Sequence, residues 1–226
     1  MGIISLEKSD RLYWLGRYTE RVFTTLSVFF EYYDTMIDSD PEAYREVCRQ
    51  LSIPDVYGSR EVFNWKYLFD EGDMNSIYSN LDRAFNNGVA LRDELSTTSL
   101  SYIQMALDTM KRCGVSNHQH PLLDLQEVID DLYAFWGSVD DCVEDQECRN
   151  IMKTGRYTER LDLYIRLDMD FKLIEKEFMK LRNRITKVQL PYDEMALERI
   201  AEMILREKEN WKDNRYVALE LLETVL

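Results

Sequence analysis

Glycine and proline are scarce in this chain, and no stretch of it is uniformly apolar. The 226 residues include 8 Gly and 4 Pro, a balance that favours helices over sheets. No window approaches the run of about eighteen uncharged residues that a membrane-spanning helix needs. The first residues lack the basic and apolar regions of a secretory signal. We therefore expect a cytoplasmic, helical protein that does not associate with membranes.

Positive charge, histidine and paired cysteines are also in short supply. The chain has 28 basic and 42 acidic residues, a net charge of −14. Such a surface repels nucleic acid and anionic membranes, so neither is an expected partner. The four cysteines form no Cys-x-x-Cys pair, and the histidines, His118 and His120, share one loop. We expect reduced thiols, no metal site and no cofactor.

Apolar residues recur at helical spacing along most of the chain, and strand-like alternation persists nowhere. The expected fold class is all-α: one domain, residues 1–226, built as a bundle of about six to eight helices. The clearest loop spans residues 114–121. The expected helices cover approximately residues 9–38, a short segment from residue 40, and then residues 74–95, 97–112, 121–143, 146–187, 191–211 and 214–226. An aromatic-rich stretch begins at residue 57.

The hexamer GRYTER occurs twice, at residues 16–21 and 155–160. Alignment at the offset between the copies, 139 residues, also pairs apolar positions such as Leu12 with Ile151 and Val22 with Leu161. Both copies therefore lie in long helices with the same core register. The repeat predicts two long central helices in a pseudo-twofold relation.

The charged residues of each hexamer share one stripe of roughly 100° on its helix. The stripe continues through neutral and apolar residues, which is not typical of a solvated face. If the two helices face each other, the cluster holds four arginines and two glutamates, a net charge of +2: Arg17, Glu20, Arg21, Arg156, Glu159 and Arg160.

Arginine side chains suit planar carboxylates and phosphates. The anion that balances this cluster is therefore expected to be Asp162, Asp93 or a bound ligand. Glu20 or Glu159 would act as a general base if burial raises its pKa. The same charges could instead form a structural lock that only holds the helices in register. Both interpretations stay open at this point.

Two further patterns are weaker. Asp140, Asp141 and Glu144 fit the DDxxE arrangement by which all-α isoprenoid enzymes hold Mg²⁺. Arg215-Tyr216 would correspond to the late Arg-Tyr pair of those enzymes. The alternative interpretation of the three acidic residues is a solvated helix end. The second is a basic stretch, from Lys176 to Lys187 with acids interspersed, which predicts a solvated face or a docking strip for an acidic partner.

The segments LYWLGRYTERV and GRYTERLD resemble the bacterial alpha-E domain family, which is named for its helices and its Glu-Arg motif. Residues 87–96 resemble a third segment of the family pattern, and Phe135-Trp136-Gly137 resembles the aromatic-x-Gly that precedes the second hexamer. The resemblance implies an all-helical fold. It also implies that the family's polar, ligand-binding residues are Arg17, Glu20, Arg21, Asn87, Arg92, Asp93, Arg156, Glu159 and Arg160.

Members of this family are often found alongside ATP-grasp ligases and transglutaminase-like proteins. The resemblance therefore implies a role in making or modifying peptides or amide bonds, with such an enzyme as partner and a peptide, carboxylate or acyl-phosphate as ligand. Self-association is a further expectation. Arg11, Val22 and Val89 depart from the family pattern, and the chain is short, which indicates a divergent member. These departures favour an accessory subunit, with a non-catalytic adaptor bundle as the alternative.

Overall fold

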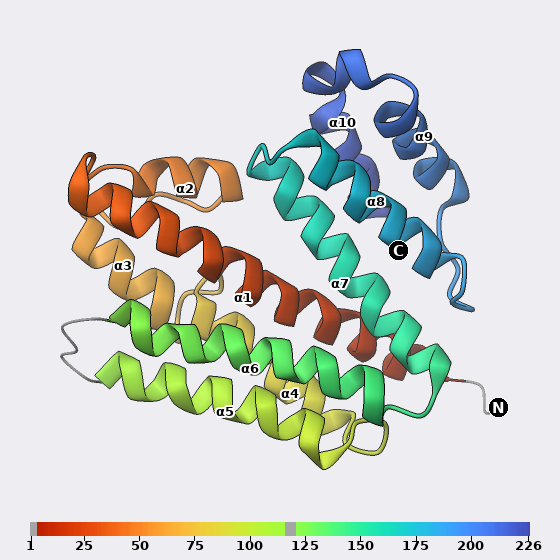
Figure 1. Cartoon of the computed structure of the whole chain (residues 1–226), viewed down its shortest axis with the longest axis horizontal. Coiled ribbons are helices and arrows are strands. Elements are labelled where there is room, and N and C mark those ends of the chain that lie inside the picture. The colour runs from red at the N-terminus through yellow and green to blue at the C-terminus, as the bar shows by residue number, and fades with distance from the viewer. Residues whose placement is uncertain (1–3, 116–120) are drawn as a thin grey trace.

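The computed structural model describes residues 4–115 and 121–226, which are largely helical (Figure 1). These residues form ten α-helices and one 3₁₀ turn, and they contain no strand. The all-α class and the helical bundle are therefore confirmed, with more helices than the six to eight expected. The elements are α1 (Leu6–Asp38), α2 (Tyr44–Leu51), α3 (Arg60–Phe69), α4 (Ile77–Ala90), α5 (Thr97–Val115), α6 (Pro121–Cys142), α7 (Gln146–Arg166), α8 (Phe171–Ile185), α9 (Glu194–Leu205), η1 (Lys208–Asn210) and α10 (Trp211–Thr224).

One of the additional helices arises where the sequence shows no glycine or proline. The helix expected over residues 146–187 is two helices, because α7 ends at Arg166 and α8 begins at Phe171. Asp168 adopts the left-handed conformation, with φ of 52°, that often follows a helix end. The side chain of Asp170 then accepts a hydrogen bond from the backbone of Lys172 at 2.8 Å and caps α8. The single long helix is therefore corrected to a helix-turn-helix.

The helices α1 and α7 cross at the two glycines of the repeated hexamer. A Cβ atom on Gly16 would lie 2.0 Å from the carbonyl oxygen of Met152, and one on Gly155 would lie 2.0 Å from that of Tyr13. Tyr13 and Met152 are equivalent positions at the offset between the hexamers. The two contacts are therefore reciprocal, and the pseudo-twofold relation of the central helices is confirmed. Glycine is required at both positions because each backbone touches the other helix.

The remaining helices surround this crossed pair (Figure 1). α4 and α6 pack against α1, with α5 behind them, while α8 packs along α7 and is followed by α9 and α10. One hydrophobic cluster contains buried residues from Leu12 in α1 to Val225 after α10, so the core is continuous across these layers. In the described part of the chain, no helix is both long and apolar enough to cross a membrane.

We expect Gly16→Ala and Gly155→Ala each to lower the free energy of unfolding by about 3 kcal/mol, because the new methyl group would meet a backbone carbonyl rather than a movable side chain. Urea denaturation of the purified variants measures this loss. Gly137→Ala in α6 is the matched control, since a Cβ there meets nothing within 4 Å. Its higher helix propensity should raise the stability by roughly 0.5–1 kcal/mol. Similar stability in all three variants would contradict the close crossing.

Candidate functional site

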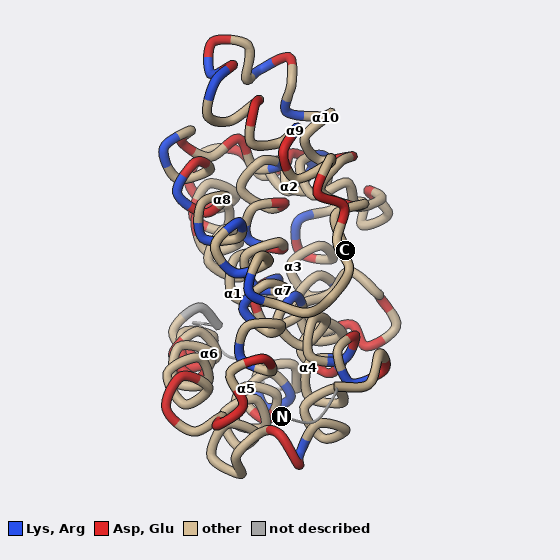
Figure 2. The backbone as a smooth tube through the Cα atoms, turned by 90° about the vertical axis from the view of Figure 1, so that its right-hand side faces the viewer, with Lys and Arg blue, Asp and Glu red and all other residues tan. Residues whose placement is uncertain are grey.

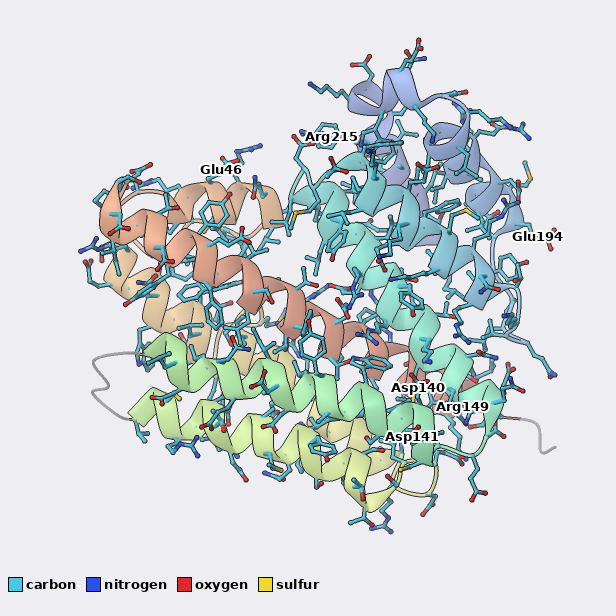
Figure 3. The ribbon with its side chains drawn as sticks, in the orientation of Figure 1. Glu46, Asp140, Asp141, Arg149, Glu194 and Arg215 are labelled. Atoms are coloured by element: carbon cyan, nitrogen blue, oxygen red, sulfur yellow. The ribbon has the colours of Figure 1, made fainter. Side chains whose placement is uncertain are left out.

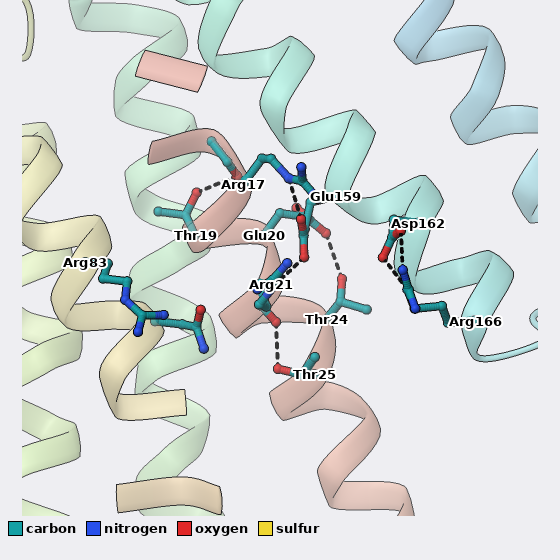
Figure 4. Close-up of polar contacts among 12 residues, drawn as sticks. Arg17, Thr19, Glu20, Arg21, Thr24, Thr25, Arg83, Glu159, Asp162 and Arg166 are labelled. Carbon is teal, nitrogen blue, oxygen red and sulfur yellow. Dashed lines mark hydrogen bonds and ion pairs between the residues drawn. The ribbon is translucent and has the colours of Figure 1, made fainter. Parts of the chain in front are cut away.

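The six charged residues of the two hexamers meet at the crossing of α1 and α7. Figure 4 shows Arg17, Glu20, Arg21 and Glu159 at this crossing. Glu159 accepts hydrogen bonds from the Nε atoms of Arg17, at 2.7 Å, and Arg21. Glu20 accepts hydrogen bonds from the Nε atoms of Arg156, at 3.0 Å, and Arg160, at 2.6 Å. Each glutamate is thus held by both arginines of the other hexamer, and both are 0 % exposed.

This arrangement follows from the sequence repeat. Arginines precede and follow the glutamate within one helical turn, so both reach the same carboxylate on the facing helix. The basic segments of α1 and α7 lie near the middle of the molecule, whereas acidic residues are spread along the chain (Figure 2). A buried carboxylate between two guanidinium groups is stable only with several hydrogen bonds, and the close crossing supplies the geometry for them.

The half of the cluster around Glu20 is closed. Its carboxylate accepts four hydrogen bonds, since Arg160 also donates from Nη2 at 2.7 Å and Thr24 donates from its hydroxyl at 2.8 Å. The guanidinium of Arg156 lies 4.3 Å from the ring centre of Trp136, and that of Arg160 lies 5.9 Å from that of Phe23. Aromatic rings therefore cover these arginines, and the carboxylate has little capacity left to accept a further hydrogen bond.

A second buried carboxylate joins the closed half, and it was not predicted from the sequence. Glu177 of α8 is 4 % exposed, lies 3.7 Å from Arg160 and accepts a hydrogen bond from Lys180 at 2.7 Å. The basic side chains of this stretch are exposed or partly exposed, as a solvated face requires, and Glu177 alone among its charged residues is buried. The helical spacing of the sequence could have indicated this burial, because Glu177 lies in the apolar stripe formed by Ile174, Phe178 and Leu181, which are all buried.

The half around Glu159 opens onto a cavity of about 350 Å³. Arg17 and Arg21 line it together with Asp162 and Arg166 from α7, and with Asn80 from α4. Asp162 is the equivalent of Phe23 at the offset between the hexamers. The ring that covers Arg160 on one side is thus replaced by a small carboxylate on the other. The same hexamer consequently has two environments, one dry and one accessible.

Asp162 does not pair directly with the hexamer arginines. Its carboxylate accepts hydrogen bonds from Arg166 one turn later, at 2.8 and 3.2 Å, as Figure 4 shows. Of the two residues expected to balance the cluster, Asp162 therefore borders it, whereas Asp93 is exposed elsewhere. Arg21 remains 35 % exposed in its side chain, against 12 % for its counterpart Arg160.

Two carboxyl groups beside the cavity have shifted pKa values in opposite directions. Burial acts to raise the pKa of Glu159, but the charges and hydrogen bonds of Arg17 and Arg21 outweigh it and hold the pKa below its ordinary value. At Asp162, burial raises the pKa in spite of its hydrogen bonds with Arg166. The general-base role considered for Glu159 required burial to raise its pKa, and the net direction is the opposite. Glu159 serves instead as a fixed anion.

The other residues implied by the family resemblance lie outside the cluster. Asn87 is half-buried in α4, and Arg92 and Asp93 are exposed just after that helix ends. Their neighbour Glu94 pairs with Lys8 at the start of α1. The structure thus brings together six of the nine candidate residues, and a ligand-binding role for the other three stays a prediction.

The DDxxE residues do not converge on one face. α6 ends at Cys142, so Glu144 lies beyond the helix, and Asp140 pairs with Lys153 of α7. Arg215 pairs with Asp168 at 3.0 Å, on the opposite side of the molecule from Asp140 (Figure 3). Within residues 4–115 and 121–226 no three His, Cys, Asp or Glu side chains gather closely enough to hold a metal ion. The isoprenoid alternative is therefore not supported, and both histidines lie outside the described residues.

The fold and this cluster define a class of all-helical protein in which two central helices exchange Glu-Arg pairs at a glycine crossing. A family model described as "Alpha-E: A predicted alpha-helical domain with a conserved ER motif" matches residues 8–205. The chain belongs to the Alpha-E family. No curated protein matches it, and neither does any solved structure.

We expect Glu20→Gln to lower the free energy of unfolding by about 3–5 kcal/mol, because it leaves Arg156 without its carboxylate partner and Arg160 with only the more distant Glu177. Glu159→Gln should cost less, since Arg21 can turn its charge toward water. Urea denaturation at pH 7 measures both losses. Glu220→Gln, an exposed substitution in α10, should change the stability by less than about 0.5 kcal/mol. Equal small losses at Glu20 and Glu159 would show that the closed half is not the more tightly coupled one.

The pKa of Glu159 predicts how that loss varies with pH. A carboxyl group whose pKa is lower in the folded than in the unfolded chain stabilises the fold fully above the ordinary value of 4.5. This stabilisation is lost as the pH falls through the folded-state pKa. The stability difference between wild type and Glu159→Gln should therefore be largest at pH 7 and shrink toward zero below pH 4.5. A difference that grows on acidification, measured by urea denaturation across this range, would contradict the ionised state.

Proposed function

We propose that this chain is a ligand-binding accessory subunit of an ATP-grasp-associated system that makes or modifies peptides or amide bonds. In this proposal the half around Glu20 holds the fold, and the half around Glu159 binds a carboxylate or acyl-phosphate group. One observation carries the division: chemically identical hexamers have unequal surroundings. A ring covers Arg160 of one half, whereas its counterpart Arg21 is 35 % exposed in its side chain and lines a cavity of about 350 Å³.

The arginine side chains beside the cavity support an anionic ligand. Arg17, Arg21 and Arg166 are opposed by Glu159, Asp162 and Glu223, so these six groups carry no net charge. Arg17 and Arg21 each use Nε on Glu159, the only carboxylate in the described chain that pairs with either of them. Their terminal nitrogens remain the natural donors for a second planar anion.

Binding is favoured over catalysis at this position. Among the described residues the cavity lining contains no cysteine or histidine, and Glu159 is held ionised by its arginines. The ligase or transglutaminase-like partner rests on the family resemblance, since other members are often found alongside these enzymes. The acidic surface of the chain is compatible with a basic docking face on such an enzyme. The cytoplasmic location and self-association are predictions from the sequence that we retain.

The alternative function, a non-catalytic adaptor in which the cluster is only a lock, is favoured by the closed half. Glu20 is saturated and covered, and Glu177 adds a further buried ion pair there. Because the pseudo-twofold axis relates Arg21 to Arg160, these two residues provide a matched pair of variants. One lies in the proposed binding half and the other in the proposed lock.

We expect acetate, succinate or acetyl phosphate to raise the melting temperature of the wild type, while acetamide does not at equal ionic strength. A ligand at 100 times its Kd stabilises by about 2.7 kcal/mol, which is a rise of roughly 5–10 °C for a chain of this size. Arg21→Gln should abolish the rise and cost less stability than Arg160→Gln, which should melt earlier but keep the rise. Thermal-shift titration measures both quantities.

Two results would contradict this proposal. If Arg21→Gln responds to the anions as the wild type does, the cavity is not their binding site. If none of the anions shifts the wild type, while Arg21→Gln and Arg160→Gln both melt early, the whole cluster is a structural lock.

A further inference from the structure

A buried hydrogen-bond acceptor beside the arginine cavity has no donor. Asn80 is 2 % exposed and lines the cavity, and its Oδ1 atom has no hydrogen-bond partner among the described residues. The orientation of the amide is set by its other end, since Nδ2 donates to the carbonyl oxygen of Ser76 at 2.8 Å. Exchanging the two ends would bring two oxygens together. Oδ1 therefore requires a donor that these residues do not supply.

A second cavity adjoins the first. It has a volume of about 590 Å³ and shares Arg17 and Glu223 with the arginine cavity. Its walls are largely apolar and aromatic, because Leu6, Tyr13, Trp14 and Leu190 line it. The guanidinium of Arg17 lies 5.0 Å from the ring centre of Trp14, so it borders both spaces. A ligand held by Arg17 thus has an apolar space next to its charged end.

We propose that the group bound here is the end of an N-acylated amino acid, such as a peptide C-terminus, with an apolar or aromatic side chain. Its carboxylate binds Arg17 and Arg21, its amide N–H donates to Oδ1 of Asn80, and its side chain occupies the cavity beside Trp14. The inference rests on the proposed function and names the ligand class for the same site.

Three features select this class over simpler anions. An inorganic anion or a plain carboxylate would leave Oδ1 of Asn80 without a donor. A free amino acid would bring an ammonium group, which would place a further positive charge close to Arg17 and Arg21. In an N-acylated amino acid the amide N–H lies one carbon from the carboxylate, so both fit in the smaller cavity. Volumes of about 350 and 590 Å³ lie within the range of small-ligand sites.

Four probes test the three contacts separately. N-acetylphenylalanine carries all three groups, 3-phenylpropionate lacks the amide N–H, N-acetylglycine lacks the side chain, and N-acetylphenylalanine amide lacks the carboxylate. Calorimetric titration of the wild-type protein should give the lowest Kd for N-acetylphenylalanine. We expect 3-phenylpropionate and N-acetylglycine to bind at least tenfold more weakly, and the uncharged amide not to bind measurably.

Variants show which residue causes each preference. The quantity compared is the ratio of the affinities of one variant for two probes, because a general loss of binding leaves this ratio unchanged. Asn80→Ala should bring the preference for N-acetylphenylalanine over 3-phenylpropionate close to one. Trp14→Ala should bring the preference for N-acetylphenylalanine over N-acetylglycine close to one. Asn86→Ala in α4 and Trp65→Ala in α3 are controls that line neither cavity and should leave both ratios unchanged. The four probes on the wild type still decide the question if a variant fails to fold.

The outcomes separate this inference from the function on which it rests. If the three carboxylates bind with similar affinity, the ligand class is wrong while anion binding stands. If N-acetylphenylalanine amide binds as well as the free acid, or no probe binds, the arginines are not an anion site and both proposals fail. If a folded Asn80→Ala variant keeps the wild-type preference for N-acetylphenylalanine over 3-phenylpropionate, the amide of the ligand does not contact Asn80.

Discussion

The exchange of Glu20 and Glu159 between the arginine pairs of α1 and α7 is the interaction on which this fold depends. Two carboxylates without solvent exposure lie at the centre of a strongly acidic protein, and each pairs with both arginines of the hexamer on the other helix. The exchange requires the helices to touch, and contact requires glycine at the crossing. Packing and electrostatics are therefore one constraint here, since a wider crossing would separate the ion pairs and leave buried charges uncompensated.

The symmetry of the crossing is broken by residues just outside the hexamers. Phe23 and Asp162 occupy equivalent positions, yet the first lies over Arg160 and contacts Tyr133, while the second borders a cavity with Arg166. A single repeated motif has in this way diverged into a covered half and an accessible half. The fold needs the ion pairs of both halves, and in one of them Arg17 and Arg21 also line a cavity.

Much of this architecture could be predicted from the sequence, because the repeated hexamer specifies it locally. The offset between the copies predicted the helix pair, its symmetry and the six residues of the cluster. The accessibility of each half could not be predicted, since it depends on rings from α6 and on residues of α4 that are distant in sequence. The break at Asp168 depends on a backbone conformation that neither glycine nor proline marks. Glu177 was missed because its charged neighbours concealed an apolar stripe, although its position within that stripe was visible.

The ion pairs of the crossing join residues that are 136 to 142 positions apart in the chain. During synthesis at about 5–20 residues per second, α1 would emerge roughly 7–30 s before its partner α7. Throughout that interval α1 exposes an apolar face interrupted by charges that have no counter-ions. The half-made chain is consequently unable to complete its central contact, and its first helix depends on the ribosome surface, a chaperone or transient local packing until α7 arrives.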